Sequence, residues 1–266
     1  WTLSLLQILR ALNRDKWFDW LLVGLLMGLT FDSKYTGLIL GASLVLYLLL
    51  SNNHRRKLFS YRPILALVFF IIAISPVIIW NYQNDFISLK FQSSGRANAI
   101  STLSLMKPTN LIGFLGSQAA LITFIAFGLM VKVYWKIIKR IKHKVVNTKD
   151  NQLFLFCFSF PLFIIFTILS PIYWVKINWI MPVYVTGIIM ASYFISIKGV
   201  KWSLYISMFL HLFGLIQVIW VPIPIKSDDT WVGWEELSIQ MEPVTEKYPN
   251  HFFWADDHYK TSSALN

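Results

Sequence analysis

The chain has 266 residues, of which 56% are hydrophobic and 14% charged, and its formal net charge is +11. An ordinary globular domain has roughly 45–50% apolar and about 25% charged residues. These proportions exclude a disordered chain, a secreted disulfide scaffold and a typical cytosolic enzyme. They predict an all-α, polytopic integral membrane protein built as a helical bundle.

Apolar stretches close to the roughly 20 residues that a transmembrane helix needs follow one another along the chain. The first, Trp1–Leu9, is predicted to end a span and to run into a basic loop with Arg10, Arg14 and Lys16. Later spans are predicted over Pro63–Trp80, Leu111–Val131, Leu153–Ser170, Trp179–Ile197 and Trp202–Val221. With a pair of short helices in Trp20–Leu50, they make seven spans after the leading one.

The stretch Trp20–Leu50 allows two interpretations, because Asp32, Ser33 and Lys34 interrupt it. Basic loops on both sides require an even number of crossings, which a hairpin with these three residues at its outer tip provides. One long tilted helix is the alternative, and it would leave Arg10–Lys16 outside. We favour the hairpin.

Lysine and arginine mark the cytoplasmic loops of membrane proteins. The basic loops are Arg55–Lys57 with Arg62, Lys132–Lys149, and Lys198 with Lys201. The loops between them and the acidic tail are then external. These short runs explain the positive charge without a nucleic-acid partner, and they indicate a multi-pass membrane protein whose C-terminal segment is extracytoplasmic.

Two regions are expected along the chain. Residues 1–221 would form a transmembrane region whose first spans lie upstream, and residues 222–266 the start of an external C-terminal domain. The chain begins at Trp1 in apolar sequence and ends at Asn266 without a clear terminus, so we interpret it as part of a longer protein. These residues alone are expected to be inactive.

Polar and aromatic residues collect on the predicted outer side, and ionisable groups at membrane depth usually line a polar cavity. The cations are Lys34, Lys90, Arg96 and Lys176. The amides and aromatic residues are Tyr35, Trp80, Asn81, Gln92, Gln118, Asn178 and Trp179. Each has a structural alternative, because lysines snorkel to the interface and tryptophans form interfacial belts. Together they predict a cationic site on the outer face.

No motif of a soluble enzyme is present: there is no P-loop, no GxGxxG after a strand, no GxSxG and no HExxH. The five histidines are scattered without metal-ligand spacing, and the single cysteine offers no thiol site. We therefore predict no metal site and no cofactor, although a divalent cation is compatible with the site. An enzyme that uses an activated lipid remains, or a transporter.

Three segments resemble bacterial glycosyltransferase family 39-like proteins, relatives of the dolichyl-phosphate-mannose protein mannosyltransferases. Residues 28–37 are similar to that group's GLxxxSKYTxL segment, residues 75–96 to SPVxxWNxxxxxxSFxFQxxxR, and residues 176–184 to KPNWPAPAY. The resemblance runs from about Trp17 to Tyr184. The chain departs from the pattern at Asp32, Ile177 and Ile180, which concerns local backbone shape more than reaction class.

The resemblance implies a multispanning enzyme of the GT-C type in a bacterial inner (cell) membrane, with an external active site. It would transfer a hexose-type sugar from a polyprenyl-phosphate donor to a lipid, glycan or protein acceptor. The four cations would bind the donor phosphate, and the amides and aromatic residues the sugar or the lipid.

The general base in that family is an Asp of the first outer loop, which would lie upstream of Trp1. Asp85 and Asp32 are the only outer acids before the tail, and neither is assigned this role, so the catalytic residue is unknown. Two other functions stay open: a transporter or flippase for a lipid-linked sugar, and a non-catalytic subunit that only binds the donor.

Overall fold

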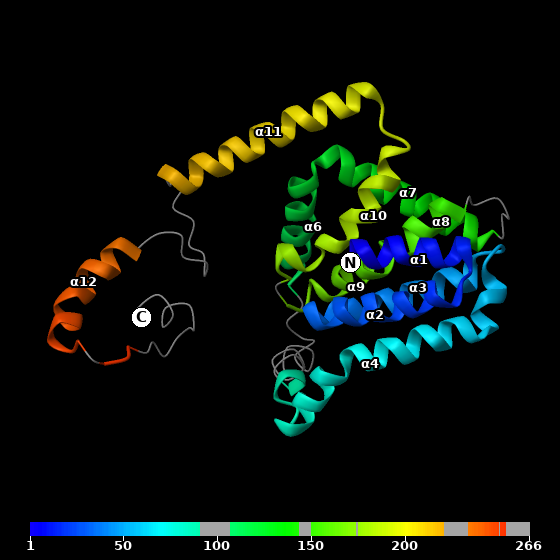
Figure 1. Ribbon diagram of the computed structural model, residues 1–266. Coiled ribbons are helices and arrows are strands. Elements are labelled where there is room, and N and C mark those ends of the chain that lie inside the picture. The colour runs from blue at the N-terminus through cyan, green and yellow to red at the C-terminus, as the bar shows by residue number, and fades with distance from the viewer. Residues whose placement is uncertain (91–106, 144–149, 174, 221–233, 250, 254–266) are drawn as a thin grey trace. The chain divides into compact units, whose positions relative to one another are not determined.

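The computed structural model describes residues 1–90, 107–143, 150–173, 175–220, 234–249 and 251–253, and helices make up their regular structure (Figure 1). The predicted all-α membrane bundle is confirmed. The chain divides into two compact units, Trp1–Ser207 and Met208–Asn266. The predicted regions 1–221 and 222–266 stay a prediction.

Helix α1 (Thr2–Arg14) is amphipathic and pairs with α2 (Trp17–Ser33). Its buried face carries polar groups that find partners on α2: the Gln7 side-chain amide donates to Asp19 Oδ1 at 3.1 Å, and the Ser4 and Thr30 hydroxyls lie 2.9 Å apart. The predicted basic loop after Trp1–Leu9 is wrong, because the helix continues through Arg10 to Arg14. One apolar face is enough to hold these residues in the helix.

The stretch after α2 folds as a hairpin rather than as one long helix. Lys34 ends α2 in an extended conformation, and a 3-10 turn (η1, Tyr35–Gly37) leads into α3 (Leu38–Leu50). A Cβ on Gly37 would lie 2.6 Å from the backbone nitrogen of Phe31, and one on Gly41 would lie 3.4 Å from Cε of Met27. From Gly37 to Gly41 the position advances along the chain, while the contacted residue goes back from Phe31 to Met27. The segment leading into α3 and α3 itself therefore run antiparallel to α2.

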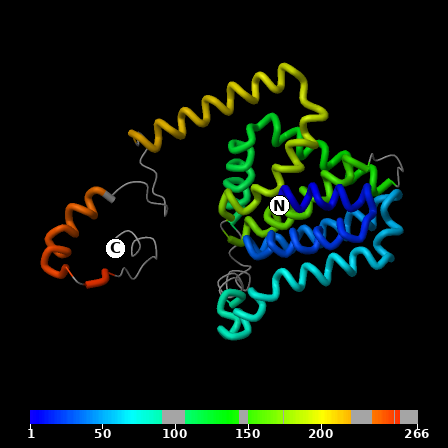
Figure 2. Tube along the Cα trace, in the orientation of Figure 1, coloured from blue at the N-terminus to red at the C-terminus, as the bar shows by residue number. Residues whose placement is uncertain are grey.

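Helix α4 (Tyr61–Gln83) follows a basic 3-10 turn (η2, Arg55–Phe59) and packs tightly along α2 (Figure 2). A Cβ on Gly24 would lie 2.1 Å from the Ala66 carbonyl oxygen, and one on Gly28 would lie 2.4 Å from the Ala73 Cβ. This is the small-xxx-small spacing that lets helix backbones approach closely in membranes. It is a signal that the sequence carries and that our sequence analysis did not use.

Proline 76 lies inside α4 and removes the hydrogen bond that its nitrogen would give to Ile72. The Ser75 hydroxyl donates to the Ile72 carbonyl oxygen at 2.8 Å and so satisfies the freed acceptor. Such local repair is what allows proline inside a transmembrane helix. The helix therefore continues to Gln83, past the predicted end of the span at Trp80.

The predicted span Leu111–Val131 is wrong, because the chain breaks at Thr123. Helix α6 (Pro108–Ile122) and α7 (Phe124–Lys142) are bent by 112° at this residue, whose φ is 73°. The Thr123 hydroxyl accepts a hydrogen bond from the Ala126 backbone N–H and so caps α7. The predicted loop Lys132–Lys149 is also wrong up to Lys142, which still belongs to α7; residues 144–149 lie outside the described part.

Three more helices belong to the first unit: α8 (Asp150–Cys157), α9 (Phe160–Leu169) and α10 (Met181–Ser192). The boundary between the two units at Ser207 falls within the next helix, α11 (Ile197–Trp220). The predicted span Trp179–Ile197 is too long, because α10 has 12 residues, about 18 Å at 1.5 Å per residue. Lys198 and Lys201 belong to the first turns of α11 rather than to a loop.

Among the described residues, three helices or helix pairs are long and apolar enough to cross a membrane: Tyr61–Gln83, Asp150–Leu169 and Ile197–Trp220. Counting α6 with α7 as one bent span makes up to four, against the seven we predicted. Of the remaining predicted spans, Tyr35–Leu50 and Met181–Ser192 are shorter apolar helices, and α2 has 17 residues. The second unit holds α12 (Trp234–Lys247), whose four glutamates make it acidic.

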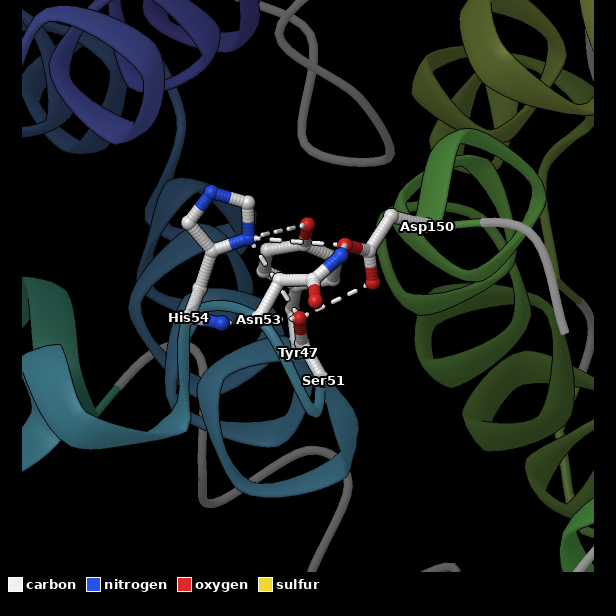
Figure 3. A network of polar contacts seen from close by, with 5 residues as sticks. All are labelled: Tyr47, Ser51, Asn53, His54 and Asp150. Atoms are coloured by element: carbon white, nitrogen blue, oxygen red, sulfur yellow. Dashed lines mark hydrogen bonds and ion pairs between the residues drawn. The ribbon is translucent and has the colours of Figure 1, made fainter. Parts of the chain in front are cut away.

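A network of polar contacts joins the end of α3 to the start of α8 (Figure 3). Asp150 accepts hydrogen bonds from the Ser51 hydroxyl, at 2.9 Å, and from the Asn53 amide. The His54 Nδ1 lies 3.0 Å from the Tyr47 hydroxyl and 3.8 Å from Asp150 Oδ2. The network therefore fastens the loop after α3 to the α8–α9 pair.

The network makes stability depend on pH through His54. Burial lowers the pKa of this imidazole, an effect that Asp150 opposes and Lys57 reinforces, so the folded protein favours neutral histidine. As pH falls through the unfolded value of about 6.5, the unfolded chain takes up the proton first and stability decreases. We expect the apparent Tm in detergent to fall between pH 7.5 and 5.5, and to fall less in His54→Gln; equal slopes would contradict this role.

Candidate functional site

The tip of the α2–α3 hairpin presents an exposed ammonium group. Lys34 caps the C-terminus of α2, where a cation is favoured by the helix dipole. Its Nζ donates to the backbone oxygen of Asn178 at 3.5 Å, across 144 residues of sequence. This is long for a hydrogen bond, so a stronger acceptor such as a phosphate oxygen could displace it. Partial burial lowers the pKa of Lys34.

The segment that Lys34 contacts is a short 3-10 turn (η4, Ile177–Trp179) ahead of α10. Val175 and Ile180 are buried on either side of it, which holds Lys176 and Asn178 at the surface between them. Ile180 therefore serves as a core anchor where the family pattern has proline. The hairpin tip and this turn, both singled out from sequence, do lie together.

Trp179 lies half-buried in the same turn. Its ring centroid is 5.9 Å from that of Phe166 and 6.1 Å from that of Tyr173. These contacts fix the indole against α9 and leave part of its surface accessible. An aromatic face of this kind suits either a sugar ring or a lipid chain.

A second polar cluster joins the hairpin tip to the end of α4. The Tyr35 hydroxyl lies 2.9 Å from the Ser88 hydroxyl, and Ser88 donates to the side-chain oxygen of buried Asn81. Asn81 in turn donates to the Val77 carbonyl oxygen at 2.9 Å. Tyr35 and Asn81 were predicted site residues. Ser88 was named only within the resemblance, and seven residues of separation gave no sign that it would reach back to Asn81.

A tight reversal after α4 makes this cluster possible. Asp85 and Phe86 have φ angles of 51° and 55°, which non-glycine residues seldom adopt. The Phe86 N–H donates to the Asn81 carbonyl oxygen at 2.7 Å, the long-range bond of a Schellman ending. The turn brings Ser88 back over Asn81. Asp85 itself is exposed, and its role as a base stays unassigned.

The side-chain hydrogen bonds of Gln118 go to Tyr184 and Ser117 and not to residues of the hairpin tip. It is fully buried in α6, and its side-chain oxygen accepts a hydrogen bond from the Tyr184 hydroxyl of α10. A sugar hydroxyl could reach this amide only if that pair opened. Its role as a sugar ligand therefore stays a prediction, and its observed contact fixes α6 on α10.

The remaining predicted residues are either exposed or outside the described part of the chain. Trp80 and Lys90 are exposed at and after the end of α4. Gln92 and Arg96 lie outside the described residues. The described cluster, which we call the tip site, consists of Lys34, Tyr35, Asn81, Ser88, Lys176, Asn178 and Trp179.

The contact between Tyr35 and Ser88 gives a direct test of how the tip site is held. A hydrogen bond of this kind contributes about 1 kcal/mol, or roughly a fivefold change in an opening equilibrium. We expect Tyr35→Phe to speed amide hydrogen exchange about fivefold at Lys90, whose N–H donates to Phe86 within this segment. Tyr193→Phe, at an exposed tyrosine, is the control. Unchanged exchange at Lys90 would mean that the contact does not hold the segment.

Comparison with known proteins bears on the first part of this site. Residues 1–80 match the family model described as dolichyl-phosphate-mannose-protein mannosyltransferase. No curated protein and no solved structure matches the chain. The match includes the hairpin tip and ends at Trp80, so the resemblance that we drew over residues 81–184 rests on its motifs. Residues 1–80 are therefore similar to the dolichyl-phosphate-mannose-protein mannosyltransferases, and this match supports a membrane glycosyltransferase of the GT-C type.

Proposed function

We propose that the protein transfers a hexose-type sugar from a polyprenyl-phosphate donor to a lipid, glycan or protein acceptor at the outer face of a bacterial inner membrane. The observation that carries the proposal is the contact of Lys34 with Asn178, since it assembles two motif segments into one cationic surface. When the sugar leaves, negative charge develops on the donor phosphate, and a fixed ammonium stabilises it.

An apolar groove supports a lipid donor. Between α3 and α4, over Met27 of α2, lies a groove of about 420 Å³ whose lining is almost entirely apolar. Phe70 at one end of it packs on Phe31, and Phe31 on Tyr35, with ring centroids 6.0 and 5.1 Å apart. An isoprenoid chain in this groove would have its phosphate end near the tip site.

The experiment uses the complete protein in membranes, with radiolabelled polyprenyl-phosphate sugar and cell-envelope extract. Transfer of label to an acceptor supports the proposal. Movement of labelled donor across sealed vesicles without transfer would identify a flippase instead. Donor binding that depends on Lys34, with neither transfer nor movement, would identify a subunit that only binds the donor.

A further inference from the structure

The exposed face of α7 carries lysines beside the middle of a candidate membrane span. Tyr134, on the buried face of α7, hydrogen-bonds Ser159 and packs against phenylalanine rings of α8 and α9. Ser159 lies midway along Asp150–Leu169, a candidate membrane span. Lys132 and Lys136 are two residues to either side of Tyr134, so their Cα atoms lie within roughly 3 Å of its level along the helix.

Charge inside a bilayer is costly unless something compensates it. Insertion scales make a lysine at the centre of a transmembrane helix strongly unfavourable. Helix α7 contains no Asp or Glu, and in the described part of the chain none of Lys132, Lys136 and Lys139 forms an ion pair. The three exposed lysines follow one another along one side of the helix. A negative partner from outside the chain would remove the cost.

Aromatic residues around the lysines indicate where that partner comes from. Lys136 Nζ lies 5.2 Å from the ring centre of Phe194, just past the end of α10, and Lys139 Nζ lies 5.1 Å from that of Trp135. Trp135 and Tyr193 are 60% exposed. Exposed aromatic residues beside lysines are typical of the headgroup level of a bilayer. Lys136 and Lys139 lie in the C-terminal half of α7, so the interface at which α7 ends is the nearer one.

We propose that Lys132, Lys136 and Lys139 bind the phosphate headgroups of anionic phospholipids from the leaflet on the side where α7 ends. Each lysine near a membrane surface adds to the attraction for anionic lipids. The lipid phosphates would be drawn toward the middle of α7, with the bilayer thinned locally. This site is separate from the tip site, and the inference does not depend on the proposed transferase function.

The test uses the full chain in nanodiscs that contain equal amounts of phosphatidylglycerol and phosphatidylcholine. Native mass spectrometry counts the lipids that remain bound after mild delipidation. The variant Lys132→Gln/Lys136→Gln/Lys139→Gln is compared with a control that loses the same charge at exposed positions, Lys16→Gln/Arg55→Gln/Arg56→Gln. We expect the unaltered protein and the control to retain phosphatidylglycerol, and the α7 variant to retain at least tenfold less.

Three outcomes would overturn the proposal. Equal retention of the two lipids by the unaltered protein does so without any variant, and therefore holds even if the α7 variant fails to fold. If both triple variants lost phosphatidylglycerol equally, the binding would depend on the net charge of the protein and not on the α7 lysines. An acidic protein that copurifies with the unaltered chain and is lost from the α7 variant, with lipid binding unchanged, would identify a protein partner instead.

Discussion

Replacing Lys34 with alanine is expected to lower sugar transfer by the complete protein at least tenfold, with the loss in kcat. The ammonium at the hairpin tip is held by one weak contact to the Asn178 backbone, so it is available to the donor phosphate as charge develops there. Loss of one stabilising donor at such a position typically costs 10²–10³ in rate when the site is closed to water. Lys34 is exposed, so we place the expected loss at the lower end.

The same role of Lys34 predicts how sugar transfer changes with pH. Burial lowers the pKa of Lys34, so its charge is lost at lower pH than that of a free lysine. Transfer should therefore decline on the alkaline side, and Lys34→Arg should extend activity to higher pH because arginine stays protonated. Lys107→Ala removes an exposed cation elsewhere and is the control. If Lys34→Ala transferred sugar as fast as Lys107→Ala, the tip site would not be the donor-phosphate site.

The largest expected effect on stability comes from Gly24→Ala. A methyl group there would lie 2.1 Å from the Ala66 carbonyl oxygen, a backbone atom that cannot move aside without shifting α4. Overpacking of this kind costs typically 1–3 kcal/mol, and it outweighs the roughly 1 kcal/mol that alanine gains over glycine in a helix. We expect a drop of several degrees in apparent Tm.

The matched control is Gly128→Ala in α7, where a new Cβ meets nothing within 4 Å. There the gain in helix propensity acts alone, so the apparent Tm should stay or rise. Thermal unfolding of both purified proteins, in the same detergent, makes the comparison. If Gly24→Ala left Tm unchanged or raised it, as Gly128→Ala is expected to do, α2 and α4 would not approach as closely as described.

Much of this architecture could be predicted locally. The apolar stretches became helices, and three charged or polar residues, Asp32, Ser33 and Lys34, correctly marked the turn of the hairpin. The predicted spans were wrong where the composition of a segment does not determine the path of its backbone. Hydropathy averages over about 20 residues, so it could not register the break at Thr123. It also assigned the lysines of α7 to a loop, although one buried face keeps them in a helix.

The sequence by itself determined that this is a helical membrane protein, and the match of its first 80 residues supports a membrane glycosyltransferase of the GT-C type. Only the tertiary structure decided that Lys34 meets Asn178 and that Tyr35 meets Ser88. Hydropathy and motifs depend on neighbours along the chain and can be recognised without a fold. The contacts depend on how closely glycine lets α2 and α4 approach and on a left-handed turn after α4, and these are set by packing between distant segments.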